Sequence, residues 1–112
     1  MSKRGDLECI SDVKEAIIRI ESYIKHTDYQ EFLKDIKTQD AVVRNLEIIG
    51  EAVKDISTNF KKKHEAVEWK SIAGMRDKLI HHYFGVNLEI IWDIAANKIL
   101  KLKTLIEKIS KE

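Results

Sequence analysis

The sequence has no proline, one cysteine and four glycines among its 112 residues. Without proline, no position forces a helix to break. Apolar residues recur at steps of three and four along most of the chain, which favours helices throughout. The one cysteine, Cys9, excludes an internal disulfide and fits a reducing compartment. We predict that Cys9 packs as a small apolar residue on a helix.

Long apolar runs and a large net charge are also absent. No stretch approaches the roughly 18–20 apolar residues of a membrane span, and the N-terminal MSKRGDLECI lacks the apolar core of a signal peptide. These absences predict a cytoplasmic protein with no membrane partner. The formal net charge is +1, so nucleic acid would be bound through local patches and not by global attraction. The length predicts one domain, residues 1–112.

Apolar periodicity predicts a first helix over about residues 7–24, with six aliphatic side chains along one face. The rhythm breaks at HTDYQEF, where Thr27 or Asp28 is predicted to cap a short helix. The short helix would carry Phe32, Leu33 and Ile36. The six residues of the first stripe are Leu7, Ile10, Val13, Ile17, Ile20 and Ile24.

The next helix is predicted to begin with Thr38 as its N-cap and to be the central one, because it is apolar on more than one side. Gly50 in its middle costs about 1 kcal/mol relative to alanine. We therefore expect another helix, from this chain or a second one, to approach closely at Gly50. The main stripe of the central helix consists of Val42, Leu46, Ile49, Val53, Ile56 and Phe60.

The stretch STNFKKKHEAVEWK, residues 57–70, is predicted to be a polar connection. The last helix is predicted to begin at Asn87 as its N-cap and to run to about Ile109. Trp69 and Trp92 are predicted to lie in the core or in an interface. The resulting fold is all-α, an up-and-down four-helix bundle with an additional short helix.

The segment GMRDKLIHHYFG, residues 74–85, carries more polar chemistry than packing requires. Arg76, His81 and Tyr83 form the pattern R-x4-H-x-Y. On an ideal helix Arg76 and His81 point about 140° apart, whereas Asp77 and His81 share a face. Three routes could unite them: the arginine bends around the helix, the helix loosens near Gly85, or two chains contribute to one cleft. The spacing does not choose among these routes.

These residue types suit cleavage of a phosphodiester without a metal ion. An imidazole such as His81 can accept a proton from a ribose 2′-hydroxyl near neutral pH. A guanidinium such as Arg76 can hold two phosphate oxygens, and Asp77 could orient His81 or hold Arg76. Taken singly, each of these residues also fits a packing role or a surface ion pair. His82 is predicted to be non-catalytic, and no Cys, His or carboxylate set completes a metal site.

The same residues resemble the HepT-like toxins of the HEPN superfamily. The resemblance rests on QDAVVRNLEIIGEAVKDIS and WKSIAGMRDKLIHHYFGVNLEIIWDI, covers roughly residues 38–95, and includes the R-x4-H-x-Y signature. The N-terminal DLECISDVKEAIIRIESYI agrees more loosely. One departure is AANKILKL, because many relatives have a proline near Ile99. This departure concerns the shape of the last helix and not the site.

The resemblance implies a HEPN-like homodimer in which Arg76 and His81 of both chains line a shared cleft. It also implies a metal-independent endoribonuclease that uses no cofactor and takes RNA as substrate. In such toxin–antitoxin systems an MntA-like nucleotidyltransferase antitoxin transfers AMP to the motif tyrosine, which would be Tyr83 here. The alternative is a catalytically inactive HEPN module that binds a nucleotide or the nucleotidyltransferase.

Overall fold

The computed structural model describes residues 5–82 and 87–111, and for residues 80–82 it describes the backbone alone. Within these residues the chain is helical and contains no strand, which confirms the predicted all-α class. The helices in chain order are α1 (Asp6–Ile24), α2 (Tyr29–Lys34), α3 (Ile36–Asp55), α4 (Thr58–Lys63), α5 (Trp69–His82), α6 (Leu88–Asp93), the π-helix η2 (Ile94–Lys98) and α7 (Ile99–Ser110).

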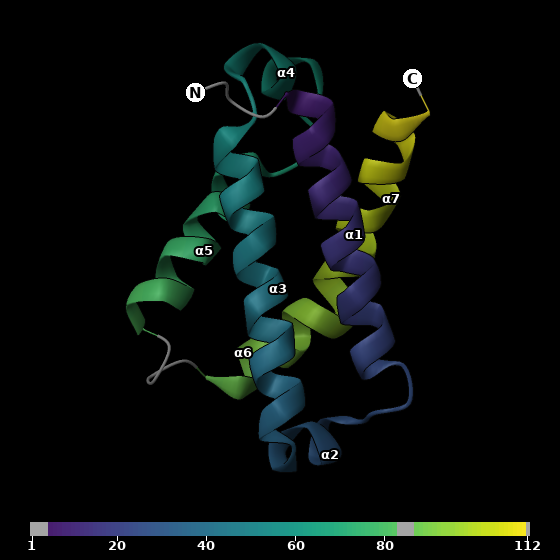
Figure 1. The fold of residues 1–112 in the computed structure, drawn as a ribbon, viewed down its shortest axis with the longest axis vertical. Helices are drawn as coiled ribbons and strands as arrows, with labels where there is room; N and C mark the ends of the chain where they lie inside the picture. Colours follow the sequence, from purple (N-terminus) through teal and green to yellow (C-terminus); the bar gives the residue numbers. More distant parts are fainter. Residues whose placement is uncertain (1–4, 83–86, 112) are drawn as a thin grey trace.

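Helix α3 lies at the centre of the bundle, as predicted. It packs against α1 on one side and α5 on the other, and α1 also contacts η2 and α7 (Figure 1). The short helices α2 and α4 lie at opposite ends of the bundle (Figure 1). The four main helices are therefore α1, α3, α5 and the run from α6 through α7. Among the described helices, none combines the length and apolarity needed to cross a bilayer.

The core is built from the predicted stripes of α1 and α3 together with apolar residues of the last helix. Fully burying a Leu or Ile side chain contributes about 1.5–3 kcal/mol, so these stripes determine which helix faces meet. Cys9 is buried among them, as predicted, whereas Leu7 is 71% exposed and does not belong to the stripe. The fully buried members of the two stripes include Val13, Ile17, Ile20, Val42, Leu46, Ile49 and Val53.

The predicted N-cap of the central helix, Thr38, lies three residues after the observed one. Helix α3 begins at Ile36, and its N-cap is Asp35, whose Oδ1 accepts a hydrogen bond from the Thr38 backbone N–H at 3.1 Å. Thr38 instead donates its hydroxyl to Asp35 Oδ2 at 2.6 Å. Ile36 consequently belongs to α3 and is 70% exposed. Asp28 caps α2 by accepting from the Glu31 N–H at 2.8 Å, which confirms one of the two predicted alternatives.

The segment predicted to be a polar connection contains a second short helix. Helix α3 ends at Asp55, so the expectation that its stripe continues to Phe60 is wrong. Ser57 starts α4 by accepting from the Phe60 N–H at 3.2 Å, and both its N–H and its hydroxyl donate to Asp6 of α1. The Ser57 cap thus starts a new helix, α4, shortly after α3 ends.

The last helix begins at Asn87, as predicted, because the Asn87 side chain accepts from the Glu89 N–H at 2.8 Å. The helical run continues to Ser110, but η2 interrupts its α-helical geometry within the segment AANKILKL. A π-turn accommodates one extra residue and shifts the register of the helix beyond it. Trp92, before this turn, packs on Phe32 with ring centroids 5.2 Å apart, which confirms its predicted packing role.

Candidate active site

Helix α5 carries the R-x4-H segment, and its first residue anchors it to the preceding short helix. Trp69 is buried, and its indole N–H donates to the carbonyl oxygens of Lys61 at 3.2 Å and His64 at 3.0 Å. A buried tryptophan needs such a partner for its N–H. These bonds join the end of α4 to the start of α5 and confirm the predicted packing role of Trp69.

Gly50 of α3 is the point at which α5 approaches most closely. A Cβ built on Gly50 would overlap the Cβ of Arg76, and would lie 2.9 Å from its Cγ and 3.2 Å from its Cα. These are atoms at the base of the side chain and on the backbone, so they cannot move aside without moving α5. The predicted close approach is confirmed, and the approaching helix belongs to the same chain.

The Arg76 side chain therefore lies at the seam between α3 and α5, where it is 26% exposed. Its Nη1 donates to Asp77 Oδ1 at 3.3 Å. Its Nε is buried, and among the described residues this atom has no hydrogen-bond partner. Within the described part of the chain Arg76 has this one long contact, so its Nη groups retain N–H donors for another anion.

Asp77 has a second and shorter contact, which the sequence interpretation missed. Lys54 of α3 donates from Nζ to the same Oδ1 atom at 2.6 Å. The hydrogen bond from Lys54 is the main cause that holds the pKa of the Asp77 carboxyl below its usual range; burial opposes this shift, and the weaker hydrogen bond from Arg76 adds to it. Asp77 is thus ionised at neutral pH, and the cluster of two cations and one carboxylate keeps a net positive charge.

The contact between Arg76 and Asp77 bears on how the arginine can reach the predicted histidine. Helix α5 keeps α-helical geometry from Arg76 through His82, and the predicted loosening near Gly85 lies outside the described residues. Arg76 turns its guanidinium toward Asp77, the residue one helical turn before His81 on the same face. This geometry fits an arginine that bends around the helix, and it leaves the two-chain cleft open.

Two of the four predicted site residues lie partly or wholly outside the described residues. They are His81, of which only the backbone is described, and Tyr83, so their roles stay predictions. Gly74, seven residues before His81 and on the same side of α5, faces open space: a Cβ added there would meet nothing within 4 Å. The surface of α5 is therefore open at Gly74.

A metal centre receives no support from the part of the chain that the structure describes. Within residues 5–82 and 87–111, no group of three or more His, Cys, Asp or Glu side chains is placed to hold a metal ion. The described chemistry of the site is instead that of a positively charged cluster, suited to a phosphate group.

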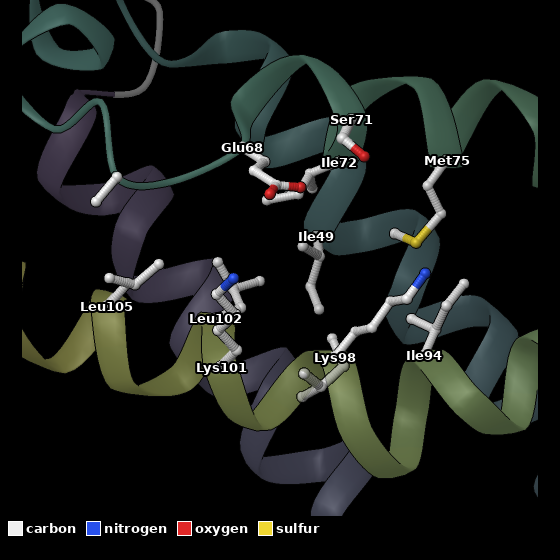
Figure 2. Close-up of a pocket in the computed structure, with 12 residues that line it drawn as sticks. Ile49, Glu68, Ser71, Ile72, Met75, Ile94, Lys98, Lys101, Leu102 and Leu105 are labelled. Carbon is white, nitrogen blue, oxygen red and sulfur yellow. The ribbon is translucent and has the colours of Figure 1, made fainter.

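A groove runs along another side of α5 and separates it from η2 and α7. Its volume is about 310 Å³. Figure 2 shows Lys98 and Lys101 extending from η2 and α7 toward α5, and Glu68 of the loop before α5 on the opposite wall. The apolar residues that line it include Ile49, Ile72, Met75, Ile94, Leu102 and Leu105.

Comparison with known proteins gives one consistent result. The family model described as "Ribonuclease HepT-like" matches residues 13–109. A Methanocaldococcus jannaschii protein named "Putative RNase MJ0127" is 47% identical over 112 residues, which are 100% of this chain and 93% of that protein. A Thermococcus cleftensis protein named "Probable ribonuclease HepT" is 45% identical over 109 residues, 97% of this chain and 99% of that protein. No solved structure matches the chain.

Proposed function

Because this chain belongs to the HepT-like ribonuclease family, we propose that it is an endoribonuclease that cleaves RNA without a metal ion. The observation that carries the proposal is the Arg76 guanidinium, held at the seam of α3 and α5 within a cluster of net positive charge. Such a cluster attracts a phosphate and counters the charge that develops on it during cleavage.

In the proposed reaction His81 accepts the proton of a ribose 2′-hydroxyl. The 2′-oxygen then attacks the adjacent phosphorus, the bond to the 5′-oxygen breaks, and that oxygen takes a proton from water, while His81 releases its own proton to solvent. Arg76 binds the phosphate oxygens and stabilises their added charge in the transition state. Asp77 keeps the guanidinium on the face of α5 that His81 shares. The products carry a 2′,3′-cyclic phosphate and a 5′-hydroxyl.

We expect the purified protein to cleave RNA at neutral pH in the presence of EDTA, because no step of the reaction uses a metal ion. His81→Ala should lose this activity, and His82→Ala, the same change one residue later, should retain it. Mass spectrometry of the products should find 2′,3′-cyclic phosphates. Cleavage that stops with EDTA or persists in His81→Ala would contradict the proposal. Partner binding without any cleavage would favour the inactive helical module instead.

The homodimer predicted from the family resemblance would complete the site with a second copy of Arg76 and His81. The open groove beside α5 supports this proposal, because an apolar groove of this kind is the type of surface that a second subunit covers. Its position along the motif helix would bring the two candidate sites near each other.

Light scattering at micromolar concentration is expected to give twice the 13.0 kDa chain mass. Leu105→Glu places a charge in the groove and should shift the mass toward one chain, because an unpaired charge is costly to bury. Leu100→Glu is the matched control, since Leu100 lies in the same helix but is 52% exposed outside the groove. A wild-type monomer, or equal masses for both variants, would contradict this interface.

We further propose that the chain is the toxin of a toxin–antitoxin pair and that Tyr83 is its regulatory site. Tyr83 is seven residues after Arg76, which places the two residues on one side of an ideal helix. An AMP group added to Tyr83 would introduce a bulky anion that blocks RNA sterically and by charge.

Incubation with an MntA-like nucleotidyltransferase and ATP should add adenylyl groups to the intact protein and abolish RNA cleavage. Tyr83→Phe removes the acceptor oxygen with little change in shape, so it should resist both effects. The readouts are the intact mass and the cleavage rate. An adenylylated Tyr83→Phe protein, or full activity after modification of the wild type, would contradict the role of Tyr83.

A further inference from the structure

Two residues of α3 contact the Arg76–Asp77 pair from positions one helical turn apart. Gly50 receives the Cβ of Arg76, and Lys54 donates to Asp77 at 2.6 Å. Positions four apart lie on the same face of a helix, so Gly50 and Lys54 both face the turn of α5 that carries Arg76 and Asp77. We propose that Gly50 and Lys54 are positioning residues that set the orientation of the Arg76 guanidinium.

The two residues act by different means. Gly50 acts through shape, since the absent side chain allows α5 to approach α3 closely enough to place Arg76 at the seam. Lys54 acts through charge, since it and Arg76 share a single carboxylate oxygen, Oδ1 of Asp77. The Lys54 contact is the shorter of the two, so Lys54 fixes the position of that oxygen, and Arg76 adapts to it.

Lys54 also keeps Asp77 from neutralising the arginine. Arg76 donates a single hydrogen bond to Asp77 at 3.3 Å, although guanidinium and carboxylate groups commonly form two parallel bonds. Without Lys54, Asp77 is free to turn fully onto Arg76, which would occupy the donors that a phosphate needs. The pair would then carry no net charge. Lys54 thus preserves both the open donors and the positive charge of the cluster.

A role in stability does not account for the Lys54 contact. The side chains of Lys54 and Asp77 are 39% and 47% exposed, and ion pairs this exposed contribute little to folding. Lys54→Met is therefore expected to leave the melting temperature nearly unchanged while altering the site. A large loss of stability in this variant would point to a structural role and overturn the positioning role.

The proposal rests on the proposed ribonuclease function, and kinetics provide the first test. Lys54→Met is expected to lower kcat for RNA cleavage about 10- to 100-fold, the range for a misplaced catalytic group, with a smaller change in KM. Lys54→Arg keeps a donor and a charge, so it should recover most of the activity. Lys14→Met removes an exposed lysine of α1 and should cleave as the wild type does. Equal kcat values for Lys54→Met and Lys14→Met would overturn the proposal.

A second measurement does not depend on cleavage. In NMR spectra, Lys54→Met should shift the Nε–H signal of Arg76, assigned with Arg76→Lys, and should raise the pKa of Asp77 because its main hydrogen-bond donor is gone. Unchanged signals would overturn the positioning role even if the wild type cleaves RNA. If the wild type does not cleave RNA, the ribonuclease proposal fails separately, and a shifted Arg76 signal still supports the positioning contact.

Discussion

Alanine in place of Arg76 is expected to lower kcat for RNA cleavage about 100- to 1,000-fold, the loss typical when one donor to the developing anion is removed. The effect should fall mainly on kcat, because the contact strengthens as charge builds on the phosphate in the transition state. Steady-state kinetics with a short RNA in EDTA measure both constants.

The Arg76→Ala result can be assigned to chemistry because of where Gly50 lies. The Cβ of Arg76 is the atom that packs on Gly50, and alanine keeps this atom. The packing of α5 on α3 should therefore be retained, and the melting temperature should change little. Arg76→Lys keeps the charge but loses the planar pair of donors, so it should recover only part of the activity. Wild-type kcat in Arg76→Ala would remove Arg76 from the mechanism.

Gly50→Ala is expected to lower the free energy of unfolding by about 1–2 kcal/mol. In an ordinary helix the same change stabilises by about 0.5–1 kcal/mol. Here the added methyl group overlaps Arg76 at its Cβ, and overpacking of this kind costs about 1–3 kcal/mol. Because this overlap can be removed only if α5 moves away from α3, cleavage activity should fall together with stability.

Gly74→Ala is the matched control, since it makes the same change in a neighbouring helix. A Cβ at Gly74 meets nothing within 4 Å, so this variant should gain the ordinary helix stabilisation of about 0.5–1 kcal/mol. Urea unfolding of both variants measures the difference directly. If Gly50→Ala is stabilised as much as Gly74→Ala, the close approach of α5 to α3 does not exist in solution.

The sequence predicted the fold class and the central helix because both depend on local patterns. Apolar residues on more than one side identified α3 as the helix with several neighbours, and the cost of Gly50 indicated a close approach. The identity of the approaching group, Arg76, could not be predicted. It depends on how α3 and α5 pack against each other, and the spacing of residues along one helix does not determine that packing.

The predicted helix boundaries were wrong where two local signals compete. Asp35 and Thr38 are both good N-caps, and the carboxylate of Asp35 accepts from the N–H of Thr38, so the earlier residue starts the helix. The step from Ile56 to Phe60 continues a helical period across the real end of α3. Only the serine cap at Ser57 indicates a new helix there, and its spacing alone is a weak signal.

The candidate site was predictable in its residue types but not in its full membership. Arg76 and Asp77 belong to a recognisable pattern, whereas Lys54 resembles any other exposed lysine until α5 is placed beside α3. Its distance of four residues from Gly50 is the one available signal. That spacing has meaning only after Gly50 is known to face α5.

The π-turn of η2 has a consequence for how the helical run from α6 through α7 can change in length. Because a π-turn absorbs one extra residue, removing one residue from Ile94–Lys98 and restoring α-helical winding would leave the faces of α7 nearly where they are now. Leu102 and Leu105 would therefore still line the groove. The run from α6 through α7 can therefore lose one residue at this position without disturbing the groove or the Arg76 cluster.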